Sequence, residues 1–155
     1  MDKAITTALM ILAGVVSMIF VFNSAYPMIN RSSDAMVSMA DKIDDRMKSR
    51  VSIVHAANSS DRRTVYIWVK NVGSTRITPI EESDLFFGQQ TNFYRVTYGG
   101  TGYPRWSYAL ESGTEWLTGY TVKITITYNA DPGAGTYYIK FVVPNGMSDE
   151  YYFSM

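Results

Sequence analysis

The residues able to do chemistry are few and lie far apart in the sequence. His55 is the only histidine, and the 155 residues contain no cysteine. The chain has no G-x-S-x-G, H-E-x-x-H or Walker-type motif, and no acid or nucleophile is spaced in a fixed pattern around His55. Because catalysis requires such a constellation, we expect a protein that is not an enzyme and that uses no cofactor.

Three carboxylates form the densest group of potential ligands. Glu81, Glu82 and Asp84 follow Pro79 within six residues. Calcium takes six or more oxygen ligands, usually from a loop in which ligands alternate, and this segment has no such loop. We therefore interpret the group as a solvated turn and expect no metal, with a cation site or a partner contact as the alternatives.

Aromatic residues suggest a second kind of site. Tyr103, Trp106, Tyr108 and Trp116 could stack on sugar rings in a carbohydrate-binding or adhesion module, or they could fill the core of a β domain. Asn58 begins the sequence Asn-Ser-Ser in a polar turn, so it is a candidate for glycosylation if this part of the chain lies outside the cell.

The N-terminal part of the chain must position the rest, because it is a long apolar segment. Residues 4–22 have no charged side chain, and about 20 apolar residues are enough for a helix to cross a membrane. We expect a span over about 4–27 that includes Ala4, Leu9, Leu12, Val15, Ile19 and Phe22. A cleaved secretory signal and a buried core helix are the alternatives. Pro27 predicts a kink or break.

A second helical pattern covers about residues 32–50. Its apolar side chains are spaced by four, three and four residues, which is typical of a narrow coiled-coil stripe. This stalk stripe consists of Met36, Ala40, Ile43 and Met47. It could mediate self-association with other subunits, or it could pack on its own domain.

From Val51 the pattern changes to alternation, which is typical of strands. The clearest strands are residues 64–71 and 120–128, with shorter ones expected elsewhere, including 114–117, and an edge segment near 79–87. Seven or eight strands separated by Gly and Pro turns predict an antiparallel immunoglobulin-like sandwich. The expected fold class is therefore α+β, with the N-terminal helix over residues 1–50 and an all-β domain over 51–155.

The formal net charge is zero, so nothing in the charge balance favours a nucleic-acid partner. Composition supports the division into two parts. Seven of nine Met lie in the first 47 residues, whereas eleven of twelve Tyr and all three Trp lie after residue 60.

Three parts of the chain resemble the archaeal flagellin-like family, which includes archaellins and type IV pilin-like proteins. They are the apolar helix, VYIWVKNVGSTRITPIEESDLFFG at residues 65–88 and EWLTGYTVKITITY at 115–128. The most specific blocks are residues 69–74 and 79–86. Within the family the chain is most similar to the archaellum accessory proteins FlaG and FlaF.

The resemblance implies a structural stator component of the archaellum, the archaeal flagellum. Such a protein would be held in the cell membrane by one span, with its β domain outside the cell in the pseudoperiplasm. Its partners would be copies of itself, other stator or pilin-like subunits, the surface-layer protein and membrane lipid. The alternative is a filament subunit of archaellin or pilin type. Residues 1–4 lack the basic-residue-then-Gly cleavage site of archaellins, which favours the accessory role.

Overall fold

The computed structural model describes residues 2–155 and divides into two compact units, which meet in the sequence between Ile43 and Asp44. The first unit is helical. The second, which we call the β unit, contains the last turn of the same helix and all of the strands.

Helix α1 extends from Asp2 to Lys48 and is long and apolar enough to cross a membrane, judged by length and composition. The hydroxyls in its apolar part are satisfied within the helix. Thr6 and Thr7 donate to the carbonyls of Asp2 and Lys3, and Ser17 donates to that of Ala13 at 2.8 Å. Such bonds make hydroxyl side chains compatible with a lipid environment, where water cannot solvate them.

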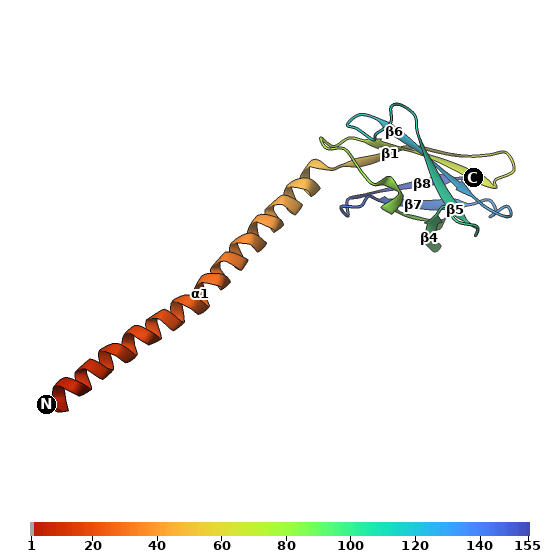
Figure 1. Ribbon diagram of the computed structural model, residues 1–155. Coiled ribbons are helices and arrows are strands. Elements are labelled where there is room, and N and C mark those ends of the chain that lie inside the picture. The colour runs from red at the N-terminus through yellow and green to blue at the C-terminus, as the bar shows by residue number, and fades with distance from the viewer. Residues whose placement is uncertain (1) are drawn as a thin grey trace. The chain divides into compact units, whose positions relative to one another are not determined.

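Proline lacks an N–H group, so a kink or break was expected at Pro27. The helix continues through Pro27 without a break, and the kink stays a prediction. The segments that the sequence assigned to a span and a stalk therefore form one element (Figure 1).

The β unit contains eight strands and one short 3₁₀ helix. The strands are β1 (Val51–Asn58), β2 (Thr64–Asn71), β3 (Asp84–Gln89), β4 (Asn92–Tyr98), β5 (Arg105–Leu110), β6 (Thr121–Thr127), β7 (Thr136–Val142) and β8 (Ser148–Ser154), and η1 spans Ile80–Glu82. They form one sheet in the order β1-β2-β6-β5-β4-β3-β7-β8. This nearly closed sandwich after a long apolar helix confirms the predicted fold class.

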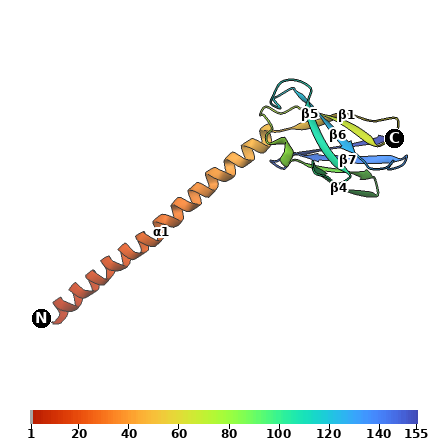
Figure 2. The ribbon, with the colours of Figure 1, turned by 45° about the vertical axis from the view of Figure 1, so that its right-hand side comes forward.

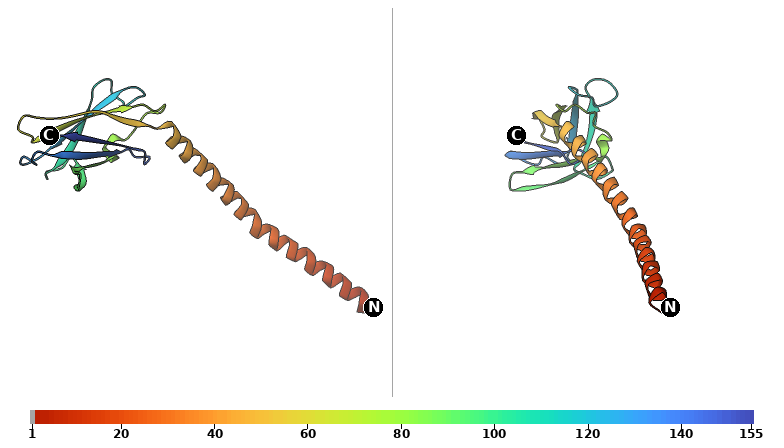
Figure 3. Two further views of the ribbon diagram at one scale, coloured as in Figure 1. Left: turned by 180° about the vertical axis from the view of Figure 1, so that it is seen from behind. Right: turned by 90° about the vertical axis from the view of Figure 1, so that its left-hand side faces the viewer.

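The two halves of the sheet lie face to face, with β1, β5 and β6 in one layer and β4, β7 and β8 in the other (Figures 2 and 3). The predicted alternation is confirmed in the two clearest strands. Their inward residues are fully buried: Val65, Ile67 and Val69 on β2, and Val122, Ile124 and Ile126 on β6. Rings from the other half, including Phe87 and Phe141, complete the core.

Three details of the predicted sandwich are wrong. The halves are joined by a short parallel pairing of β4 with β5 at Thr97–Arg105 and Tyr98–Trp106, although an entirely antiparallel sheet was expected. Residues 114–117 form no strand, and Trp116 makes only an isolated bridge to Ile77. The region near 79–87 is not an edge, because β3 lies between β4 and β7.

The two outermost strands, β1 and β8, are linked by a side chain. The Ile53 N–H donates to the Asp149 carboxylate at 2.7 Å. This bond lies at an irregularity of β1, where the register shifts between Ile53 and His55. A bulge of this kind disrupts ladder pairing locally. The Asp149 carboxylate therefore supplies the acceptor for the Ile53 N–H on the open edge of β1.

The turn after β2 holds the end of α1. The Ser74 N–H donates to the Lys48 carbonyl at 2.7 Å, and Val72 and Gly73 both donate to the Arg50 carbonyl at 2.9 Å. A Cβ at Gly73 would lie 2.4 Å from the Lys48 carbonyl oxygen. Gly73 therefore permits a backbone approach that any larger residue would obstruct.

Two buried serines near this region predict opposite effects of the same substitution. Ser83 is buried and its hydroxyl has no partner, whereas the buried Ser49 hydroxyl bonds the Thr75 hydroxyl at 3.0 Å. Leaving a buried polar group unpaired costs about 1–3 kcal/mol. We expect Ser83→Ala to raise the free energy of unfolding by about 1 kcal/mol and Ser49→Ala to lower it by about 1 kcal/mol.

Urea unfolding of the full chain in detergent measures both effects. All three tryptophans lie in the β unit, so their fluorescence reports its unfolding alone. A loss of stability in Ser83→Ala equal to that in Ser49→Ala would contradict the assignment.

Candidate functional site

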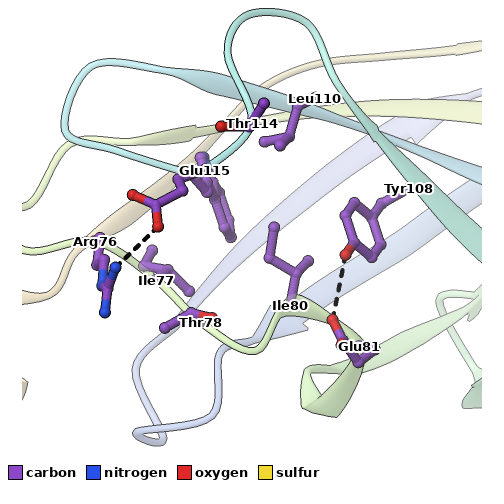
Figure 4. Close-up of a pocket in the computed structure, with 10 residues that line it drawn as sticks. Arg76, Ile77, Thr78, Ile80, Glu81, Tyr108, Leu110, Thr114 and Glu115 are labelled. Carbon is purple, nitrogen blue, oxygen red and sulfur yellow. Dashed lines mark hydrogen bonds and ion pairs between the residues drawn. The ribbon is translucent and has the colours of Figure 1, made fainter.

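One hollow of the β unit lies between η1 and β5. It has a volume of about 250 Å³. It is lined by the segment that leads into η1, by η1 itself, by β5 and by the loop after β5: Arg76, Ile77, Thr78, Ile80, Glu81, Tyr108, Leu110, Thr114, Glu115 and Trp116. We call it the η1 groove (Figure 4).

The groove exists because β5 lacks a neighbour along part of one edge. On that edge β5 pairs with β4 only at Arg105 and Trp106, so the edge from Ser107 onward has no strand beside it. The Ile77–Trp116 bridge and the buried side chain of Ile80 close the floor.

Two polar contacts lie on either side of the isoleucines in Figure 4. The Arg76 guanidinium pairs with the Glu115 carboxylate at 2.9 Å, and the Tyr108 hydroxyl donates to Glu81 at 3.2 Å. Burial raises the pKa of Tyr108, and the negative charge of Glu81 raises it further. The phenol therefore remains a neutral donor at physiological pH.

The side chains that line the η1 groove are of mixed character. Apolar side chains from β5 and from the segment that leads into η1 lie beside two threonines, and the charged groups are already paired. The lining residues include no histidine or cysteine, so they offer none of the usual pairs of nucleophile and base.

The acidic residues singled out from the sequence do not converge. Glu81 accepts from Tyr108, and Asp84 on β3 pairs with Arg95 on β4 at 2.6 Å. Glu82 is exposed. Over residues 2–155, no three side chains of His, Cys, Asp or Glu are placed to hold a metal ion.

The aromatic residues also separate into different environments. Trp106 and Trp116 are each only 1% exposed, so they belong to the core and cannot stack on a sugar. Tyr103 is exposed, with the Arg105 guanidinium 4.8 Å from its ring centre. Tyr108 lines the η1 groove. His55 on β1 lies against the Trp68 ring at 5.4 Å between centres, which is a packing role.

A row of three aromatic rings, in which Phe93 and Tyr152 are exposed and Tyr138 between them is buried, was not expected from the sequence. Phe93 reaches Tyr138 across Gly88, with ring centres 4.8 Å apart, and Tyr138 contacts Tyr152 at 5.2 Å. Gly88 pairs with both Phe93 and Tyr138 in the ladder, so its missing side chain makes room for the contact. Tyr138 and Tyr152 lie on consecutive strands, but β4 is distant from them in sequence, so no local pattern could have connected Phe93 to the other two rings.

The remaining predicted residues lie on α1 and at the end of β1. Those of the predicted span, from Ala4 to Phe22, and Met36, Ala40 and Ile43 of the stalk stripe lie on the part of α1 in the first unit, which buries none of its side chains. Met47 lies in the last turn of α1, in the β unit, and is exposed. Asn58 ends β1, where its side-chain amide donates to the Ser59 carbonyl at 2.9 Å.

Comparison with known proteins gives consistent relatives. No protein-family model matches the chain. An uncharacterized protein of Archaeoglobus fulgidus is 26% identical over 162 residues, covering 98% of both chains.

Two solved structures are similar in sequence and in fold. The archaellum periplasmic stator protein FlaG from Sulfolobus acidocaldarius is 29% identical with a TM-score of 0.61, and the match covers 68% of this chain and 99% of that one. The periplasmic stator complex of FlaF and FlaG from the same organism contains a chain that is 30% identical with a TM-score of 0.59. That match covers 66% of this chain and 87% of that one.

Proposed function

Because the chain belongs with the archaellum stator proteins FlaG and FlaF, we propose that it is a structural, membrane-anchored component of the archaellum motor. The observation that carries this proposal is the match to a solved FlaG over 99% of that structure at 29% identity. Similarity in sequence and fold together supports a shared role better than fold alone does.

In this role α1 anchors the protein and the β unit lies outside the cell. The apolar part of α1 has the length of a single span, and its hydroxyls bond within the helix. A FlaG relative named as periplasmic supports the outer location of the β unit.

The partners we propose are copies of the chain, other stator or pilin-like subunits and the surface-layer protein. A stator complex of FlaF and FlaG supports contacts between such subunits. The stalk stripe would contact other copies, and the η1 groove offers the β unit a second contact. We further propose that the sequence divides into folding units near residue 50, with residues 51–155 able to fold alone.

The anchoring role predicts a loss of membrane binding when charge enters the span. Gly14→Asp combined with Val15→Asp places two carboxylates in the middle of the apolar segment, and a charge there costs about 2.5–3.5 kcal/mol on insertion scales. We expect the variant to leave the membrane fraction, measured by sedimentation and carbonate washing. Gly14→Ala with Val15→Ala is the matched control and should remain in that fraction. A charged variant that still resists carbonate washing would refute the span.

The stator role predicts a motility defect from the stalk stripe. Deleting the gene should abolish swimming, and the full chain should restore it. Ile43→Asp removes an exposed apolar side chain that would be worth about 1.5–3 kcal/mol when covered, so we expect weaker cross-linking between subunits and slower swimming. Ser38→Asp adds the same charge outside the stripe and should behave like the wild type. Normal swimming and cross-linking in Ile43→Asp would show that the stripe has no role in assembly, and a deletion strain that swims normally would refute the stator role.

The outer location of the β unit makes Asn58 a proposed glycosylation site. The residue lies at the end of β1, before an exposed turn. We expect the protein purified from its own cells to exceed its sequence mass by that of a glycan, and Asn58→Gln to remove the excess. Equal excess mass in both proteins, or none, would contradict this assignment.

A further inference from the structure

The continuity of α1 extends the stalk stripe far beyond the residues that first defined it. Counting back from Ile43 in alternating steps of three and four residues reaches Ile5, and the alternation is never interrupted. The positions met in the first unit form what we call the long seam: Ile5, Ala8, Leu12, Val15, Ile19, Phe22, Tyr26, Ile29, Ser33, Met36, Ala40 and Ile43. Its hydroxyl-bearing members are Tyr26 and Ser33, and every other member is apolar.

The residues that would disturb such a seam lie elsewhere on the helix. No charged residue of α1 falls on the seam, although ten charges occur between Asp2 and Lys48. Pro27 immediately follows Tyr26, in the position next to the seam that points outward in a coiled coil. A missing backbone donor there does not interrupt the contact face.

We infer that the long seam binds the same seam of a second copy of this chain, as a parallel, in-register coiled coil that passes through Pro27. The inference rests on the proposed function, because insertion in one membrane gives all copies the same direction. It goes beyond the stalk stripe by including the apolar span and by fixing the register.

Periodicity and charge identify the partner as a second copy. From Arg31 to Lys48 every charged side chain lies off the seam, whereas residues 4–30 carry no charge on any face, so the stalk defines the repeat and the uncharged span can follow it. A face with this repeat stays toward a partner when both helices supercoil with the same repeat. A globular surface has no such repeat, whereas another α1 matches it at every step. In register, Ser33 also meets Ser33 and Tyr26 meets Tyr26, so each hydroxyl position opposes its equal instead of an apolar side chain.

The absence of cysteine allows a direct test with single-cysteine variants of the full chain in native membranes. Ser33→Cys lies on the seam, and Ser38→Cys lies on the outer face of the same stalk. Ala8→Cys lies on the seam within the span, and Ala13→Cys lies outside it. Each pair makes the same chemical change on the same segment. A disulfide forms only where Cα atoms approach to about 4.4–6.8 Å.

We expect oxidation to give severalfold more disulfide-linked dimer from Ser33→Cys than from Ser38→Cys, and from Ala8→Cys than from Ala13→Cys. Equal yields within either pair would overturn the inference. A preference for Ala13→Cys over Ala8→Cys would also overturn it, because the register would then shift between the span and the stalk.

A motility assay of the same strains under reducing conditions tests the proposed function separately from the coiled coil. A strain that swims but shows no seam-specific dimer refutes the coiled coil and leaves the stator role intact. Seam-specific dimer in cells whose swimming does not depend on the protein would instead support the coiled coil and refute the stator role.

Discussion

The β unit depends on a junction at which one buried side chain organises three segments. Asn71 ends β2 and is fully buried. Its amide donates to the carbonyls of Thr75 and Trp116 at 2.8 and 3.2 Å, and its side-chain oxygen accepts from the Gly73 N–H at 3.0 Å. Because an unpaired buried polar group costs about 1–3 kcal/mol, each of these bonds holds its segment strongly in place.

The same turn also receives the helix. Residues 72–74 donate to the carbonyls of Lys48 and Arg50, and Arg46 donates to the Asn145 carbonyl at 3.0 Å. The bonds from residues 72–74 join backbone groups and have no side-chain rotamers to relax, whereas the Arg46 bond depends on its side chain. A force applied along the end of α1 therefore reaches β2, at the centre of one sheet half, through the turn that Asn71 stabilises. This arrangement would suit the proposed stator role.

The junction explains part of the resemblance seen in the sequence. The block Val69–Ser74 contains the last inward residue of β2, the buried Asn71 and Gly73, where a Cβ would meet the helix end. A block without catalytic residues can thus be specific because its geometry is demanding. Position 71 requires a buried side chain that both donates and accepts hydrogen bonds, and position 73 requires a residue without a Cβ. Few residue types satisfy either requirement.

Alternation predicted β2 and β6 well, because each has one face against the core and a register that a slip would reverse. Alternation failed for residues 114–117, which form a loop. Trp116 in this loop is buried, although its backbone makes only the isolated bridge to Ile77. The position of β3 and the parallel contact of β4 with β5 depend on pairings between distant segments, which local patterns do not record. For the same reason the sequence could not reveal the η1 groove, whose walls come from separate segments.

The long seam would operate in two solvents, and its parts would contribute differently. In water, covering large side chains such as Met36 and Ile43 is favourable because it removes apolar surface from solvent. In lipid that force is absent, and helices associate through close packing and hydrogen bonds. The stalk would therefore provide most of the drive for pairing, while small residues such as Ala8 allow close approach in the span. Because α1 is one continuous helix through Pro27, a register set in water would be carried along it into the membrane.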